Sequence, residues 1–177
     1  KFPIVLPDNV HLIGASMIWT KLDAQADENA EAAVMIIKEV NDVKVANMTL
    51  TGGYSEGHGC TGGGGLLLAA NDMFNLGDEN GDWATSTPVI ENVIIKDNHS
   101  HNGGGLATFR VNGPVLNNVE ISGNVATAFG GGVFAYVSTI TMNGVTISDN
   151  HNLGNGQGGG IMLAATAGTF DNMTITN

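Results

Sequence analysis

Three oxygen-bearing side chains stand at the spacing of a calcium-binding loop. Asp78, Asn80 and Asp82 occupy alternate positions, as the first three ligands of such loops do. Trp83 replaces the glycine that is usual at the sixth position, and no glutamate follows at the twelfth. Two interpretations stay open, a solvated acidic loop and a structural Ca²⁺ site, and Ca²⁺ is the one cofactor that the sequence suggests.

Histidines form a second group that could do chemistry. His99 and His101 are two residues apart, so on a strand their side chains would share one face. They could serve as a metal pair or in proton transfer, but the sequence offers no clear third ligand. His151 repeats the position of His99 two coils further on, too far away for one shared metal ion. The alternative is a solvated role at a corner of the fold.

The overall composition excludes several classes of partner. The 177-residue chain has 6 Lys and Arg against 17 Asp and Glu, a formal net charge of −11, and 42% hydrophobic residues. Because nucleic acids and anionic membranes attract clustered cations, we expect no nucleic-acid partner and no membrane insertion. The apolar content argues against disorder, and Cys60, the only cysteine, cannot form an internal disulfide. The length suits a single domain spanning 1–177.

Short repeats organise the chain that must position these residues. Residues 92–98 (Asn-Val-Ile-Ile-Lys-Asp-Asn) return as 118–124 and 144–150, at steps of 26 residues. Degenerate copies lie at 9–14, 47–53 and 172–177. Each clear copy is followed by a glycine run and a second apolar strand, and a third short strand precedes the next copy. Such a repeat favours a coil that stacks each strand on its counterpart in the next turn. A series of hairpins would not explain why equivalent strands recur at a fixed step.

Apolar and polar residues alternate within the repeated strands, so that Val93 and Ile95 point one way and Ile94 the other. Stacking then predicts three inward columns of equivalent residues. The columns are Met48, Val93, Val119, Val145 and Met173; Leu50, Ile95, Ile121, Ile147 and Ile175; and Val45, Ile90, Leu116, Met142 and Phe170.

Two kinds of residue are expected at the corners. Asn98, Asn124 and Asn150 fall at one corner, where stacked amides can hydrogen-bond along the column. Glycine runs such as 103–105 fall at the next corner, where they allow positive φ and close backbone approach. The predicted fold is therefore all-β: one right-handed parallel β-helix, or solenoid, of about five to six three-strand coils.

The repeated Asn-Val-x-Ile-x-x-Asn followed by Gly-Gly-Gly and Ile or Leu resembles the right-handed parallel β-helix repeats of bacterial surface and secreted proteins. It is similar to the repeats of chlamydial polymorphic outer-membrane proteins, although the Phe-x-x-Asn half of that pattern is absent, and to pectate-lyase-like β-helices. The resemblance covers nearly the whole chain and implies the fold together with an extracellular or cell-surface location. It implies no particular activity, because this fold hosts enzymes, adhesins and passive stalks.

The catalytic patterns of such β-helices are incomplete here. Gly57-His58-Gly59 resembles a short motif of polygalacturonase-type hydrolases, whose Asn-Thr-Asp, Asp-Asp and Arg-x-Lys segments do not occur. Pectate lyases need several aspartates for Ca²⁺ beside a basic residue, whereas Arg110 is the only arginine. Cys60 lies close to His58 without a third partner, so we interpret it as a small corner residue. The question of an enzyme stays open, with the sequence leaning against one.

The first functional hypothesis is a non-catalytic structural and binding module of an adhesin-like or fibre-forming surface protein. Its partners would be itself, by end-to-end β-stacking, or flanking domains of a longer chain, and carbohydrate. The alternative is a polysaccharide lyase or glycoside hydrolase that acts on an acidic polysaccharide beside the loop at 70–88. Three or more carboxylates with a lysine or arginine on one outer face would favour the alternative.

Two further features carry expectations. The acidic, alanine-rich segment 23–32 is interpreted as a polar loop or a short helix. The aromatic residues Phe109, Phe134 and Tyr136 could form a patch that stacks sugars or binds a partner, and this interpretation places Phe134 and Tyr136 on opposite faces of their strand.

Overall fold

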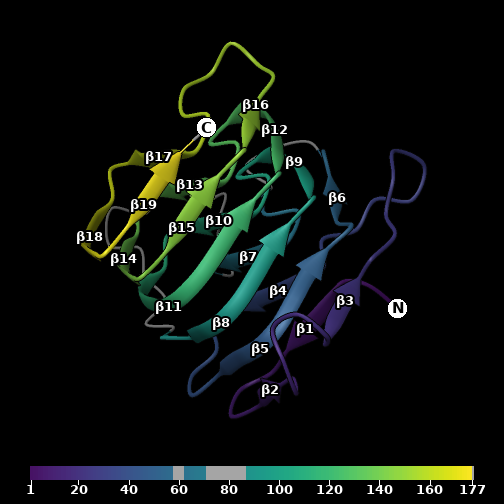
Figure 1. Cartoon of the computed structure of the whole chain (residues 1–177), viewed down its shortest axis with the longest axis vertical. Coiled ribbons are helices and arrows are strands. Elements are labelled where there is room, and N and C mark those ends of the chain that lie inside the picture. The colour runs from purple at the N-terminus through teal and green to yellow at the C-terminus, as the bar shows by residue number, and fades with distance from the viewer. Residues whose placement is uncertain (58–61, 71–86, 177) are drawn as a thin grey trace.

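The computed structural model describes residues 1–57, 62–70 and 87–176. Within these ranges the regular elements are all β-strands, and all pairings between them are parallel. The strands wind into a β-solenoid of about five turns (Figure 1), so the predicted all-β parallel solenoid is confirmed. Segment 23–32 forms the end of a strand and a loop, not the short helix. The described ranges hold no helix of the length and apolarity that crossing a membrane requires.

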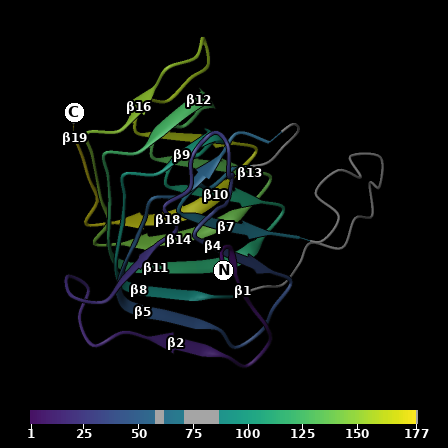
Figure 2. The ribbon, with the colours of Figure 1, turned by 90° about the vertical axis from the view of Figure 1, so that its right-hand side faces the viewer.

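Three sheets form the walls of the solenoid. The first contains, in spatial order, β1 (Ile4–Leu6), β4 (Met35–Lys38), β7 (Leu66–Ala69), β10 (Leu106–Phe109), β13 (Val133–Tyr136) and β17 (Ile161–Ala164). The second contains β2 (His11–Ile13), β3 (Lys21–Asp23), β5 (Lys44–Thr51), β8 (Val89–Lys96), β11 (Asn112–Ser122), β14 (Thr139–Asn143), β15 (Thr146–Ser148), β18 (Ala167–Asp171) and β19 (Thr174–Thr176). The third contains β6 (Tyr54–Ser55), β9 (His99–Asn102), β12 (Val125–Phe129) and β16 (His151–Asn152). Figure 2 shows the strands of successive turns lying above one another.

The core lies inside this wall, along the three predicted columns. Val93 pairs with Val119 and Ile95 with Ile121, so equivalent residues of neighbouring turns are in direct register. Column members from Val45 through Ile147 are buried almost completely. In the last described turn the columns reach an open edge, where Phe170 is 41% exposed and Ile175 is 53% exposed.

The second sheet bends where its long strands pass through the left-handed region. Asn47, Asn92 and Asn118 have φ values of 56°, 52° and 50°, a conformation that asparagine tolerates better than other residues with a side chain. Gly144 takes the same place in the next turn, with φ of 62°. The Nδ2 of Asn92 donates to Asn47 Oδ1 over 3.1 Å, and that of Asn118 donates to Asn92 Oδ1 over 2.7 Å. Sequence reasoning did not single out this second asparagine ladder.

The predicted ladder at the following corner is confirmed, and it is buried. The Nδ2 groups of Asn98 and Asn124 donate to the Oδ1 atoms of Asn124 and Asn150, each over 3.0 Å. The same amides also donate to backbone carbonyls of the preceding strands. The glycine run at the next corner permits close stacking, because a Cβ on Gly104 would collide with the carbonyl oxygen of Gly131.

An apolar layer also covers the outside of the first sheet. Phe134 and Tyr136 lie on the same outer face, so the expectation of opposite faces was wrong. Their rings are stacked, with 6.2 Å between the ring centroids and 10° between the ring planes. Residues i and i+2 of a strand share a face because the side-chain period is two. Phe109 packs against Phe134 at 5.6 Å, and both belong to a buried cluster separate from the solenoid core. These aromatic rings are therefore mostly covered, not displayed.

Candidate functional site

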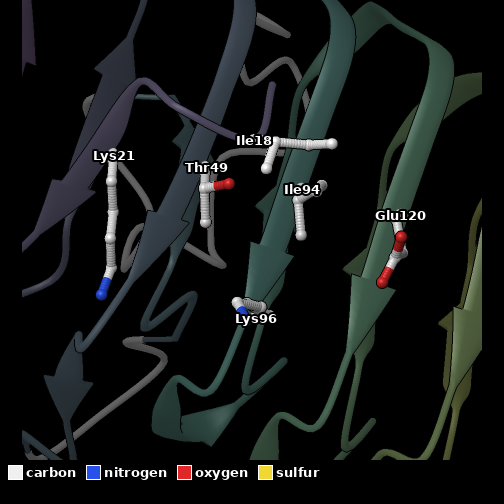
Figure 3. A pocket seen from close by; sticks show the side chains of 6 residues that line it. All are labelled: Ile18, Lys21, Thr49, Ile94, Lys96 and Glu120. Atoms are coloured by element: carbon white, nitrogen blue, oxygen red, sulfur yellow. The ribbon is translucent and has the colours of Figure 1, made fainter. Parts of the chain in front are cut away.

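A hollow lies on the outer face of the second sheet, where segment 14–20 crosses it. Thr49 on β5 holds this segment, because its hydroxyl donates to the carbonyl of Met17 over 2.6 Å and its N–H donates to the carbonyl of Thr20 over 2.8 Å. The hollow measures about 220 Å³, and its lining consists of Ile18, Lys21, Thr49, Ile94, Lys96 and Glu120. Figure 3 shows Ile18 near Thr49 and Ile94, with Lys21 and Glu120 to either side.

Strand register explains why these side chains meet. Lys21 pairs with Thr49 and Thr49 pairs with Ile94 in the row across β3, β5 and β8, and Ile94 pairs with Glu120 on β11. Lys96 stands two residues beyond Ile94 and therefore faces the same way. Residues from four turns thus form one polar row with an isoleucine in its middle.

The lysines of the hollow are already paired with carboxylates. Lys21 Nζ lies 2.9 Å from Asp23 Oδ2, and this ammonium group lowers the pKa of Asp23 from its ordinary value. Lys96 Nζ lies 3.6 Å from Asp97 Oδ2. With Glu120 added, three carboxylates face two ammonium groups, so the hollow carries no net positive charge.

Two large apolar side chains project from the segment beside the hollow. Ile18 is 65% exposed and Trp19 is 87% exposed. Ile18 belongs to the lining of the hollow, whereas Trp19 is its neighbour in the chain and lies outside the lining. Strongly exposed tryptophan is uncommon, and exposed apolar side chains can mark a binding site. Sequence reasoning treated the start of the chain only as the first coil, although the pair Ile18-Trp19 in a non-repeating segment was the available signal.

A second constellation lies on the outer face of the third sheet and includes two predicted residues. β6 pairs with β9 so that Tyr54 stands opposite His99. Their rings stack with 4.5 Å between the ring centroids and 4° between the ring planes. Glu56, just beyond β6, brings its Oε1 to 2.8 Å from His99 Nε2 and its Oε2 to 3.8 Å from His101 Nδ1. Glu56 Oε1 is buried without an aligned hydrogen bond, and each contact is an ion pair only when its histidine is protonated. Glu56 is thus the third member of a group with His99 and His101, and the sequence did not identify it.

A hydroxyl group links this carboxylate to one imidazole. Thr127 Oγ1 donates to Glu56 Oε2 over 2.7 Å and lies 3.2 Å from His101 Nδ1. Because the hydroxyl proton points to Glu56, its lone pair faces His101, which places the proton of a neutral His101 on Nδ1. The Nε2 of His101, a side chain 42% exposed, is then left as a proton acceptor.

Carboxylates from the acidic segment also approach this constellation. Glu31 Oε2 accepts the backbone N–H of Glu56 over 3.1 Å, and Ala32 bridges Tyr54 in an antiparallel pair. Burial raises the pKa of the Tyr54 phenol, and the nearby carboxylates, first of all Glu56, raise it further. The phenol therefore stays protonated to higher pH than usual.

The other candidate residues are placed as follows. His151 lies in register with Val125 and hence two turns from His99, as predicted. Across 1–57, 62–70 and 87–176, no group of three or more His, Cys, Asp or Glu side chains has the arrangement of a metal site. Asp78, Asn80 and Asp82 lie outside the described residues, and so do His58 and Cys60.

Comparison with protein-family models, curated proteins and solved structures gave no match to this chain. A function must therefore be inferred from the hollow on the second sheet, the group around Glu56 and the edges of the solenoid.

Proposed function

We propose that this chain is a structural and binding module, without chemistry of its own, of an extracellular or cell-surface protein of the adhesin-like or fibre-forming kind. The observation that carries the proposal is the open edge of the last described turn. Ile175 and Phe170 continue two buried columns there, yet they are 53% and 41% exposed. Apolar side chains already in register at an unpaired parallel edge favour pairing with a further turn.

Either a second copy of the chain or flanking coils of a longer chain would fit this edge. At one end of the solenoid the outermost strands are β1 and β2, and at the other they are β17 and β18. Because all these strands run parallel, a copy placed head to tail would continue both sheets in one direction. Such a heterologous contact does not close on itself, so it builds a fibre. Flanking coils of a longer chain would use the same edge.

Sedimentation velocity and electron microscopy over a concentration series test the proposal. We expect end-to-end oligomers that the double variant Phe170→Lys, Ile175→Lys abolishes, because two buried charges would have to be desolvated in the contact. Thr146→Lys is the control for added positive charge, since it places one of the two lysines at an exposed outer position; each single edge variant, Phe170→Lys or Ile175→Lys, is compared with it at equal added charge. A chain that stays monomeric at every concentration, with no difference between variants, would contradict self-stacking.

A second candidate function is cleavage of an acidic polysaccharide, as a lyase or glycoside hydrolase. The specific observation in its favour is Glu56, whose carboxylate lies between two histidines, with the Glu31 carboxylate next to its backbone. A carboxylate beside an imidazole can move protons, and glycosidases use two carboxylates. Among the described residues, three carboxylates grouped with lysines occur at the hollow of the second sheet, where Asp23, Asp97 and Glu120 accompany Lys21 and Lys96, and not around Glu56. In that hollow two of the three carboxylates already form ion pairs with the lysines.

Product formation from polygalacturonate and from neutral glucans separates the two functions. Cleavage by the purified chain that Glu56→Gln abolishes, with circular dichroism unchanged, would favour the enzyme and overturn the non-catalytic proposal. Glu28→Gln, in the acidic segment 23–32 that also holds Glu31, is the control, because it removes a carboxylate that contacts neither histidine in the described structure.

A further inference from the structure

We propose that the hollow lined by Ile18, the chain neighbour of the exposed Trp19, binds an uncharged saccharide. This inference rests on the proposed function as a binding module and names the class of ligand. Three properties of the described residues carry it: the balance of charge in the hollow, the apolar surfaces around it, and the polar rows that continue from it along the solenoid.

The balance of charge selects against an anionic ligand. Lys21 and Lys96 lie 2.9 Å and 3.6 Å from the carboxylates of Asp23 and Asp97. Glu120, which belongs to the lining, adds a third carboxylate that forms no ion pair with any described residue. A uronate entering the hollow would have to break an ion pair or meet Glu120, and the net charge of −11 on the chain would repel it at longer range. An uncharged ligand meets neither barrier.

The polar groups that remain suit hydroxyl groups. Ammonium hydrogens donate and carboxylate oxygens accept, so a hydroxyl, which does both, can bond to either partner of an ion pair without separating it. Glu120 already accepts the Ser122 hydroxyl over 2.9 Å, which leaves its other oxygen able to accept from a ligand. A molecule rich in hydroxyl groups therefore fits this lining.

The apolar surfaces suit the carbon face of a sugar ring. Ile94 forms part of the floor of the hollow and Ile18 part of its wall, and Trp19 follows directly with 87% of its surface exposed. A saccharide ring has one face of C–H groups and a rim of hydroxyls, so it can cover an aromatic ring while its rim bonds to polar groups. A small ion or a fully polar ligand would leave Trp19 in water.

The ligand should be a chain rather than a single ring. From Glu120 the outer row continues through Thr146 and Thr174 in strict register, and the parallel row runs from Lys96 through Ser122 and Ser148. These rows extend the hydroxyl-bearing surface along the solenoid axis beyond the hollow. An oligosaccharide lying along the axis can bond to them one turn at a time.

Tryptophan fluorescence and isothermal titration calorimetry with defined oligosaccharides test the inference. The neutral probes are cellohexaose, xylohexaose and mannohexaose, and the anionic probe is hexagalacturonate at low salt. We expect at least one neutral hexamer to bind with a Kd on the order of 1 mM or tighter. Binding should weaken about tenfold or more in Trp19→Ala, whereas Trp19→Phe should retain most of it because an aromatic face remains.

Leu153→Ala is the matched control, since it removes another strongly exposed apolar side chain, 70% exposed and away from the hollow. It should leave binding unchanged. The inference is overturned if none of the three neutral hexamers binds, if binding survives Trp19→Ala, or if hexagalacturonate binds more tightly. Stacking through the edges is measured separately with the edge variants, so failure here is distinguishable from failure of the proposed function.

Discussion

The buried amide of Asn124 accepts the Nδ2–H of Asn98 at 3.0 Å and donates its own Nδ2–H to Asn150 at 3.0 Å. It also accepts the backbone N–H of Asn98 and donates to the carbonyl of Ile95. The side chain of Asn124 has 0% exposure, and it makes four hydrogen bonds that join three successive turns. Such a fully satisfied polar column favours one register of stacking, because a slip would bury amides without partners.

We predict that Asn124→Ala strongly destabilises the solenoid. The change leaves the Asn98 amide, the Asn98 N–H and the Ile95 carbonyl without their partner, at about 1–3 kcal/mol for each buried group that stays unsatisfied. Urea unfolding should show a loss of at least about 3 kcal/mol. Asn118→Gly is the control, since Gly144 occupies the same left-handed corner one turn later. A loss of equal size in both variants would contradict a special role for the buried ladder.

Two glycines should respond oppositely to substitution. Gly104→Ala should destabilise by about 1–3 kcal/mol, because the new Cβ meets backbone oxygens of Gly131 and Val125 that cannot move alone. Gly144→Asn should be neutral or stabilising, since its nearest neighbour to a Cβ is 3.9 Å away and asparagine tolerates positive φ. Thermal unfolding of both variants measures the difference, and a tolerated Gly104→Ala would refute the packing argument.

The same substitution should have different effects along one column of the core. Ile121→Ala creates a cavity at a position with 0% exposure, and it should cost about 2–5 kcal/mol. Ile175→Ala, at 53% exposure, should cost less than about 1 kcal/mol in the monomer. Chemical denaturation at low protein concentration compares them. Equal losses would mean that Ile175 is already buried by another copy under those conditions.

Alkaline pH should destabilise the protein through Tyr54. Burial, aided by Glu56, raises the pKa of Tyr54 above its ordinary value of 10.0. The folded state therefore holds the phenolic proton more tightly, so this contribution is complete below pH 10.0 and is lost as the pH rises through the folded pKa. Tyr54→Phe should remove the loss seen in thermal unfolding above that pH. Tyr136→Phe removes the other of the 2 tyrosines and should leave the loss in place; the reverse pattern would disprove the assignment.

Much of the fold could be predicted from residue types at fixed steps. A spacing of 26 residues with alternating Val and Ile defines both the turn length and the inward face, and the Asn98 column follows from the same alignment. The column at Asn47, Asn92 and Asn118 was not predicted, although the alternation of asparagine with Gly144 is a signal for positive φ. Phe134 and Tyr136 stand two residues apart, so the side-chain period of a strand places them on one face, as their stacked rings show.

The candidate sites were less predictable. His99 and His101 could be paired from their spacing, but Glu56 could not be joined to them, because the turn between residues 47 and 92 is not of the repeated length. The step of 26 residues places Ile94 beside Glu120, as the pairing of β8 with β11 confirms, but only the folded chain brings Ile18 and Lys21 to the same hollow.

The sequence by itself determined the parallel solenoid, its inward columns and its corner asparagines, because these features repeat and each depends on local spacing alone. Only the tertiary structure decided where segment 14–20 lies and which side chains it meets. That segment occurs once, so no periodicity positions it; Thr49, 29 residues or more beyond it along the chain, holds it through hydrogen bonds to Met17 and Thr20. Contacts between a unique segment and a repeated surface depend on register across several turns, and that register is a property of the folded chain.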